Sequence, residues 1–176
     1  KFSCHILCDK ENLNMKTAII SQCQKYRYEL GRDFVENPSN TAIFCMLNPS
    51  TADAMIDDPT IRRCIQFSKD NGYDSLKVVN LYAYRSPTPK SLWTIDDPIG
   101  AENDEHLKNL FSFNKKIICA WGGNAKMDRV IKVCNMLNLL SVEMFCLGIT
   151  KSGMPKHPLY IKGDQPFIEF NLGEKN

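Results

Sequence analysis

The sequence lacks an apolar run of the roughly 20 residues that a transmembrane helix requires. The N-terminus lacks an apolar segment followed by a small-residue cleavage site, so we expect no signal peptide. Charge of one sign is not in large excess either, because 22 Lys and Arg face 20 Asp and Glu, a formal net charge of +2. Contact with nucleic acid would therefore depend on a local patch. We expect a cytoplasmic protein with no membrane partner, and the sequence indicates no oligomeric state.

Metal-binding cysteine motifs are also absent, although the chain has eight cysteines. No two of them form a C-x-x-C pair, and their spacing fits neither a zinc nor an iron–sulfur site. Cys4, His5 and Cys8 form one short cluster near the N-terminus, which is a weak pattern. Five cysteines lie inside predicted strands or on apolar helix faces, and we interpret them as small buried hydrophobic residues in a reducing compartment: Cys45, Cys64, Cys119, Cys134 and Cys146. We expect no metal and no cofactor.

Three common nucleotide-binding and catalytic motifs are missing as well. Gly122-Gly123-Asn124 can cradle an anion at a helix N-terminus, but it lacks the Gly-Lys-Ser/Thr ending of a P-loop. The chain has no dinucleotide-binding glycine pattern. It also has no Gly-x-Ser-x-Gly elbow, so an ordinary hydrolase triad is disfavoured.

The order of apolar segments predicts an α/β fold. Residues 41–47, 76–81, 116–121 and 142–147 have the pattern of buried strands, and residues 59–71, 101–111 and 126–139 have helical spacing. This alternation predicts three layers, α/β/α, around a central, mostly parallel four-stranded sheet. Residues 26–32 alternate and should form an N-terminal edge strand. We expect a single domain over residues 25–176, preceded by a loosely ordered extension, residues 1–24, with no clear element.

Polar residues gather where the four predicted strands end. The first strand runs into Asn48-Pro49-Ser50, and the second carries Asn80 at its end. The third ends in Trp121-Gly122, and the fourth leads to a polar loop that contains His157. The carboxyl ends of parallel strands share one edge of the sheet. The four loops should therefore meet at a single crevice, where ligands bind in open α/β sheets.

Plainer roles stay open for each of these residues. Asn48 can simply set a turn, Trp121 can belong to the core, and His157 can be exposed. Asp53, Asp57 and Asp58 can bind a divalent cation. Asp58 also suits the N-cap of a helix that starts at residue 59, and the other two can pair with the arginines at 62 and 63.

A series of distinctive segments lies between residues 25 and 165. They are residues 26–28, 47–53, 57–64, 79–85, 97–104, 120–122 and 153–160. Together they resemble a bacterial and phage family of unknown function, the domain of unknown function numbered sixteen forty-three. That resemblance brings no activity with it.

Four short motifs show a more distant resemblance. Asn48-Pro49, Asn80, Trp121-Gly122 and His157-Pro158 occur in the order of four motifs of the uracil-DNA glycosylase superfamily. The resemblance implies a glycosylase-like fold in which Asn48 positions a water or stabilises an oxocarbenium-like sugar. It implies further that Asn80 reads a base edge and that His157 donates a hydrogen bond to the departing base.

The same resemblance implies that an aromatic residue, Tyr82 or Tyr84, stacks on the base. The chain departs from the superfamily in that no glycine follows Pro49, no intercalating wedge is found, and the block 57–63 is not part of the pattern. A base in a duplex would have to be flipped out. The near-neutral chain suits a small nucleotide better than long duplex DNA.

These observations give one set of candidate residues. The candidate catalytic residues are Asn48, Asp53 and His157, and the candidate ligand-binding residues are Pro49, Ser50, Asp57, Asp58, Arg62, Asn80, Tyr82, Tyr84, Arg85, Trp121, Gly122, Lys151 and Tyr160. We expect a nucleobase, nucleotide or DNA as the partner and N-glycosidic hydrolysis as the reaction. Two alternatives stay open: a non-catalytic module that binds a nucleotide or modified base in phage defence or its evasion, and a metal-assisted phosphohydrolase that uses Asp53, Asp57 and Asp58.

Overall fold

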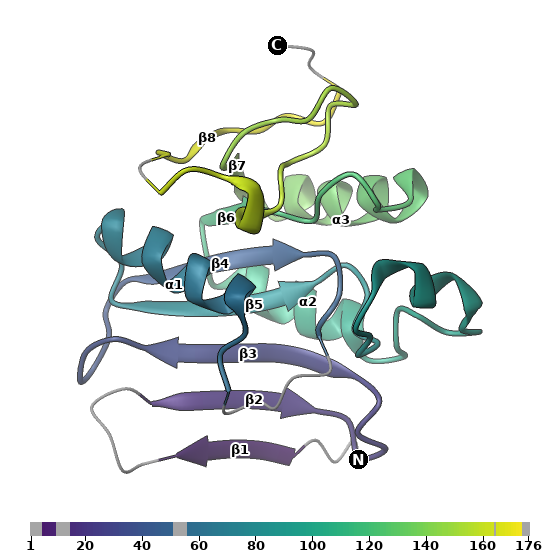
Figure 1. The fold of residues 1–176 in the computed structure, drawn as a ribbon, viewed down its shortest axis with the longest axis horizontal. Helices are drawn as coiled ribbons and strands as arrows, with labels where there is room; N and C mark the ends of the chain where they lie inside the picture. Colours follow the sequence, from purple (N-terminus) through teal and green to yellow (C-terminus); the bar gives the residue numbers. More distant parts are fainter. Residues whose placement is uncertain (1–4, 10–14, 51–55, 164, 174–176) are drawn as a thin grey trace.

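The computed structural model describes residues 5–9, 15–50, 56–163 and 165–173. In this part of the chain, an eight-stranded sheet has the order β1-β2-β3-β5-β4-β6-β7-β8 (Figure 1). The strands are β1 (His5–Asp9), β2 (Lys16–Ile20), β3 (Arg27–Asp33), β4 (Thr41–Met46), β5 (Ser75–Asn80), β6 (Lys116–Cys119), β7 (Glu143–Cys146) and β8 (Ile168–Glu169). The helices are α1 (Pro59–Asp70), α2 (Asn103–Ser112) and α3 (Met127–Leu139), with the 3-10 turns η1 (Pro89–Thr94) and η2 (Pro158–Tyr160).

The middle of the sheet is parallel, as the alternation of strands and helices predicts. β5, β4, β6 and β7 pair in parallel and correspond to the four predicted strands. β3, β2 and β1 then extend one side of the sheet in antiparallel fashion, and β8 adds an antiparallel strand to the other side. The mixed α/β class is therefore confirmed, while the sheet is larger than four strands.

Two expectations about the sheet are wrong. β1 and β2 lie within residues 1–24, where no element was expected. β3 is not an edge strand, because it is hydrogen-bonded to both β2 and β5. The added strands carry little apolar alternation: β2 buries only Ala18 and Ile20, and β8 has two residues. Segments this short do not stand out from their surroundings in a sequence.

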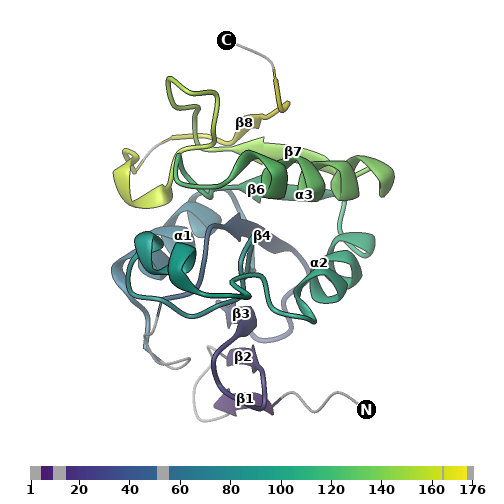
Figure 2. The same ribbon diagram turned by 90° about the vertical axis from the view of Figure 1, so that its right-hand side faces the viewer.

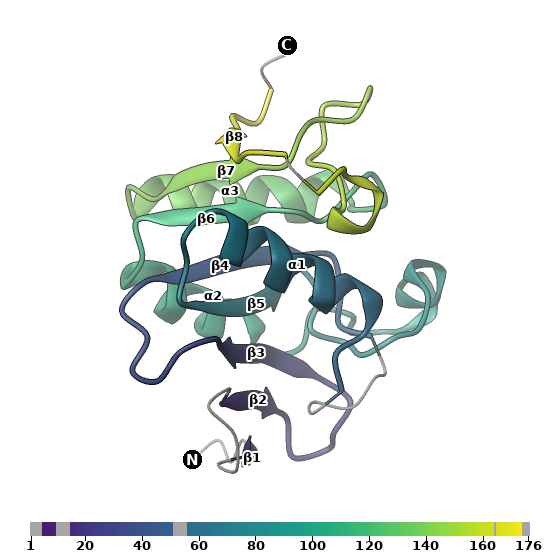
Figure 3. The same ribbon diagram turned by 60° about the vertical axis from the view of Figure 1, so that its left-hand side comes forward.

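Helices cover both faces of the sheet (Figure 2). α1 lies across β4 and β5 on one face (Figure 3), where Cys64 and Phe67 pack in the same core as Phe44. α2 and α3 cover the other face, where Phe111 and Val133 belong to a second core. The two cores follow from the strand period of two, which sends alternate side chains to opposite faces. Within the described ranges, no helix has the length and apolar character that crossing a bilayer demands.

Most of the cysteines that the structure describes lie in these cores. Cys45, Cys64, Cys119, Cys134 and Cys146 are buried, as predicted. Burial raises the pKa of the Cys45 thiol to about 12 and that of Cys134 to about 11, so both stay protonated at neutral pH. Cys23, which belongs to no predicted strand or helix, is exposed between β2 and β3. A hydrogen bond with Ser21 lowers the pKa of the Cys23 thiol.

Side chains from two helices hold the carboxyl end of β5. Nδ2 of Asn103 in α2 donates to the carbonyl oxygens of Asn80 and Leu81, both at 3.1 Å. Nε of Arg129 in α3 donates to the same Leu81 oxygen at 2.7 Å, and its Nη1 lies 2.6 Å from Oδ1 of Asp104. Asn103 and Arg129 are both buried. Because a buried carbonyl without a partner is costly, these donors allow β5 to end inside the protein.

Replacement of Asp104 should reveal the cost of burying Arg129. Burial raises the pKa of the Asp104 carboxyl, but hydrogen bonds from Lys132 and Arg129 outweigh this effect, so the pKa lies below its usual value. Asp104→Asn leaves the Arg129 guanidinium buried without its counter-charge. Because Asp104 is itself partly exposed, we expect a loss of about 2 kcal/mol in the free energy of unfolding at neutral pH.

The loss should depend on pH. A carboxylate with a lowered pKa stabilises the fold fully above its unfolded-state pKa of about 3.9, and this stabilisation disappears as the pH falls through the folded-state pKa. Urea unfolding near pH 7 and near pH 3 should therefore show a smaller difference between wild type and Asp104→Asn in acid. The control is Glu105→Gln, a matched change at the neighbouring exposed acid. Equal losses at both pH values would contradict the assignment.

Candidate functional site

A cavity of about 480 Å³ opens at the carboxyl ends of the parallel strands. Its lining includes Asn48 after β4, Trp121 and Gly122 after β6, and His157 and Tyr160 in the segment after β7. Five predicted site residues from three separate loops thus surround one space. The convergence expected from the parallel topology is confirmed for these loops. The volume lies within the range of small-molecule sites, about 300–1,000 Å³.

A smaller hollow of about 150 Å³ adjoins this cavity beside the start of α1. Asn48 and His157 line both spaces and therefore stand at their junction. The hollow adds six polar residues that the larger cavity lacks: Arg27, Ser50, Asp58, Thr60, Asn80 and Ser86. The end of the second parallel strand thus reaches the same site through Asn80.

Asn48 both shapes its turn and faces the cavity. Its Nδ2 donates to the carbonyl oxygens of Pro49 at 3.0 Å and Ser86 at 3.1 Å. These contacts use both amide protons, because a side-chain amide carries two. The Oδ1 atom remains as the acceptor that Asn48 can offer to a ligand or a water.

Asn80 is held by its backbone and leaves its side chain for the hollow. The residue is only 2% exposed, and its carbonyl oxygen is the one that Asn103 contacts. Among the described residues, no hydrogen bond uses the side-chain amide of Asn80, which lines the hollow. A buried amide without protein partners is rare. The alternative that Asn80 merely satisfies a neighbouring loop therefore holds for its backbone and not for its side chain.

His157 immediately precedes η2 and presents a neutral imidazole. Burial lowers the pKa of His157, and the negative charge of Asp58 opposes that effect in part. Nδ1 of His157 accepts a hydrogen bond from the backbone N–H of Leu159 at 3.3 Å. In a neutral imidazole the other nitrogen then carries the proton. Nε2–H is the donor that His157 can direct at a ligand.

Trp121 and Gly122 form the part of the wall contributed by β6. Trp121 is 1% exposed, and its ring packs edge-on against Phe170 at 5.8 Å between centroids. It is therefore a core residue that also lines the cavity. Gly122 has φ of +72°, a conformation that favours glycine, and a Cβ atom there would lie 3.6 Å from Cβ of His157. That distance is an ordinary van der Waals contact, so the backbone conformation, and not a lack of space, favours glycine here.

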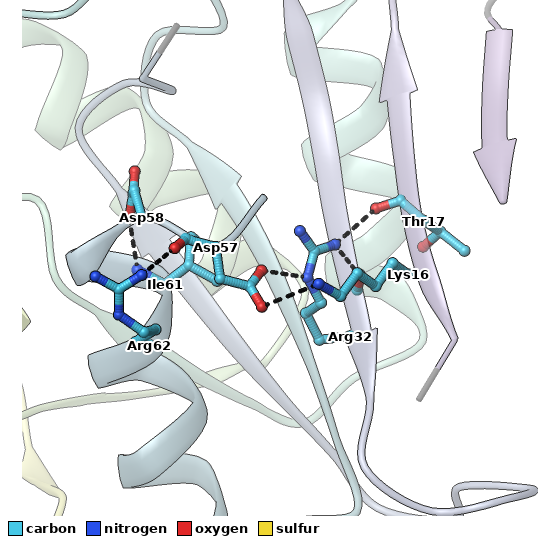
Figure 4. Close-up of polar contacts among 8 residues, drawn as sticks. Lys16, Thr17, Arg32, Asp57, Asp58, Ile61 and Arg62 are labelled. Carbon is cyan, nitrogen blue, oxygen red and sulfur yellow. Dashed lines mark hydrogen bonds and ion pairs between the residues drawn. The ribbon is translucent and has the colours of Figure 1, made fainter. Parts of the chain in front are cut away.

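Asp57 has a structural role. Its side chain points from the start of α1 toward Arg32 on β3 and Lys16 on β2 (Figure 4). Its Oδ1 lies 2.7 Å from Nε of Arg32, and its Oδ2 lies 3.4 Å from Nζ of Lys16. Arg62 donates to the backbone carbonyl of Asp57. Neither Asp57 nor Arg62 lines the cavity or the hollow, so the structure does not bring them into the site.

Asp58 is the N-cap of α1, as predicted. Its Oδ1 accepts from the backbone N–H of Ile61 at 2.8 Å, and its Oδ2 accepts from the hydroxyl of Ser50 at 2.9 Å. Asp53 lies outside the described residues. In the part of the chain that the structure covers, no three His, Cys, Asp or Glu side chains are grouped so that they could hold a metal ion.

Five other candidates do not line the cavity or the hollow: Pro49, Tyr82, Tyr84, Arg85 and Lys151. Tyr82 is buried with its ring edge-on to Trp93 at 5.3 Å, and Tyr84 meets Tyr26 in the same manner at 5.7 Å. Arg85 donates to the carbonyl of Gln24, and Lys151 is exposed in a turn. Neither tyrosine is placed to stack on a ligand there. The tyrosine at the cavity is Tyr160, which is 82% exposed at the rim.

Arg27 is the main site residue that the sequence analysis did not select. It is 4% exposed, and among the described residues its Nε has no hydrogen-bond partner. The pairing of β2 with β3 shifts between Ile19–Glu29 and Ile20–Arg27, which leaves Tyr28 as an extra residue. Such a bulge re-aims side chains, and here Arg27 faces the hollow while Tyr28 stacks on His106 of α2. In the sequence, only the position of an arginine inside an alternating strand could have indicated that Arg27 belongs to the site.

The ionisation of His157 can be measured directly. Because burial lowers its pKa, we expect a titration midpoint below the unperturbed value of about 6.5 and the Nε2–H tautomer at neutral pH. NMR spectra of the imidazole nitrogens across a pH series give both quantities, and His157→Gln assigns the signal. A midpoint at or above the unperturbed value, or an Nδ1–H tautomer, would contradict this geometry.

Comparison with known proteins gives one match. The family model described as "Protein of unknown function (DUF1643)" matches residues 27–159. The matched region runs from Arg27 on β3 to Leu159 in η2, and it includes every described residue named above as lining the cavity or the hollow except Tyr160. No curated protein and no solved structure matches the chain. Since the model spans most of its length, the chain belongs to the DUF1643 family of proteins of unknown function.

Proposed function

We propose that this protein binds a nucleobase in the hollow beside α1 and hydrolyses the N-glycosidic bond that joins the base to its sugar. The position of Asn48 and His157, which line both spaces, is the observation that carries the proposal. A base in the hollow and its sugar in the larger cavity would place the bond between them beside these two side chains.

The polar lining of the hollow supports base recognition. The Asn80 amide offers one acceptor and two donor hydrogens, and side-chain amides can contact a base edge through both at once. This is the role that the glycosylase resemblance implies for Asn80. The larger cavity, which has room for a sugar and its phosphate, contains Lys156 as a cation.

The reaction divides between the two junction residues. The bond between C1′ and the base nitrogen breaks, and its electron pair leaves with the base. A water oxygen forms the new bond to C1′, and one water proton is released. Oδ1 of Asn48 accepts a hydrogen bond from that water or stabilises the oxocarbenium-like sugar. Nε2–H of His157 donates to the departing base, where negative charge develops.

The substrate is a free nucleotide or a base flipped out of DNA. A net charge of +2 favours the smaller ligand, because binding to a DNA backbone depends on many cationic contacts. The order of the four glycosylase-like motifs also supports the reaction. The missing glycine after Pro49, the missing intercalating wedge and the block 57–63 are the departures from that pattern.

Binding without hydrolysis is a second candidate function. One observation favours it: both oxygens of Asp58, the carboxylate in the hollow, already accept hydrogen bonds within the protein. Asp58 therefore serves as the cap of α1, and the described lining of the two spaces includes no carboxylate without such a structural role. Tight binding of a nucleotide with no release of base would identify this second function.

Release of free base tests the hydrolysis. Purified protein is incubated with nucleotides and with single-stranded and duplex DNA that carry common and deaminated bases, and chromatography detects free base. We expect release from at least one substrate. Asn48→Ala and His157→Gln should each lower its rate by about 10²-fold or more, because each removes a group that acts on the transition state.

Two further variants make the test specific. Asn80→Ala should weaken binding of the same substrate, since the amide contacts the base. Asn109→Ala, an exposed change on α2, should leave both binding and rate unchanged. Release at wild-type rate by Asn48→Ala and His157→Gln would rule out the proposed roles of these residues.

A further inference from the structure

A buried guanidinium in the hollow has no partner among the residues that the structure describes. Arg27 is 4% exposed, and among the described residues no hydrogen bond or ion pair uses its side chain. Burial lowers the pKa of Arg27 to about 10, with Arg85 adding to the effect and Asp58 opposing it, so the group stays charged at neutral pH. Burying a charge without a partner is expensive, which indicates that a ligand supplies the missing acceptors.

The charges in the hollow restrict what that ligand can be. Asp58 lines the same hollow as Arg27, so a phosphate drawn to the guanidinium would also meet a carboxylate. Each Asp58 oxygen already accepts one hydrogen bond and can accept another. A neutral ring that has acceptors on one edge and N–H donors on another satisfies both side chains. The planar fork of arginine further requires two adjacent acceptors.

We infer that the hollow selects a 6-oxopurine base, such as guanine or hypoxanthine, and that Arg27 reads its O6 and N7 atoms. This inference rests on the proposed function, whose base-binding site it specifies. A 6-oxopurine presents O6 and N7 side by side, and arginine contacts this pair in a bidentate manner. Adenine places an amino donor where O6 would lie, so it faces the guanidinium with donor against donor.

The remaining polar groups of the hollow complete this recognition. N1–H of a 6-oxopurine is a donor that suits the free lone pairs of Asp58 or Oδ1 of Asn80. Adenine has an unprotonated N1, which a carboxylate disfavours. Arg27 and Asp58 therefore discriminate in the same direction, against the 6-amino purine.

Inosine and adenosine form a matched pair for the test, because they differ only at position 6 and in the proton on N1. Calorimetry with these nucleosides, their 5′-monophosphates, and single-stranded oligonucleotides with one hypoxanthine or adenine distinguishes a free nucleotide from a strand. We expect the 6-oxo ligand to bind about 10- to 100-fold more tightly in at least one pair.

Variants of Arg27 should change this ratio. Arg27→Lys keeps the charge but loses the fork, so the preference should fall by about tenfold. Arg27→Gln should move it toward adenine, whose N6 and N7 match an amide. Lys108→Gln, which removes an exposed positive charge on α2, should leave the ratio unchanged. Thermal unfolding checks folding, and we expect no loss of stability in Arg27→Gln, because the unpaired buried charge is gone.

The outcomes distinguish a failure of the 6-oxopurine assignment from a failure of the proposed base binding. Equal binding of inosine and adenosine ligands, or a ratio that Arg27→Gln leaves unchanged, overturns the base assignment and leaves base binding intact. An increase in melting temperature with inorganic phosphate that is lost in Arg27→Gln assigns the guanidinium to an anion and also overturns it. No binding to any member of the panel overturns both.

Discussion

Two buried donors that share one backbone oxygen fix the geometry on which the site depends. Asn103 and Arg129 come from different helices and meet at Leu81, immediately after β5. A buried carbonyl left without a partner costs about 1–3 kcal/mol, so the donors from the two helices stabilise the end of the strand at this depth. The docking of α2 and α3 is thereby linked to the position of Asn80. Helices on one face of the sheet thus position a side chain that lines a hollow next to α1, on the other face.

The sequence predicts the centre of this fold and not its margins. The strands that become β4, β5, β6 and β7 are apolar on both faces, and parallel strands covered by helices have this composition. Asp58 and Pro59 likewise predict the start of α1 through local capping chemistry. β2 and β8 are held mainly by backbone pairing to strands that are already present. Backbone hydrogen bonds do not depend on residue type, so the spacing of apolar residues does not predict these strands.

The candidate site shows the same division. Asn48, Asn80 and His157 could be chosen because polar residues at parallel strand ends converge by topology alone. The positions of Tyr82 and Tyr84 could not be predicted in this way. Their rings pack against Trp93 and Tyr26, and these contacts are defined only in the folded chain. Arg27 depends on a register shift between two strands. A single extra residue reverses which face a side chain occupies, and no local sequence pattern marks the shift here.

The protonated thiols of the core have a consequence for the chemistry of the whole molecule. Oxidants, disulfides and alkylating agents react with thiolates, so sulfurs that burial keeps as thiols are inert toward them. Cys23, with its exposed and more acidic sulfur, is the reactive exception among the cysteines whose side chains the structure describes. Among the described cysteines, oxidants should therefore modify Cys23 in the turn before β3, four residues from Arg27, and leave the buried thiols unmodified.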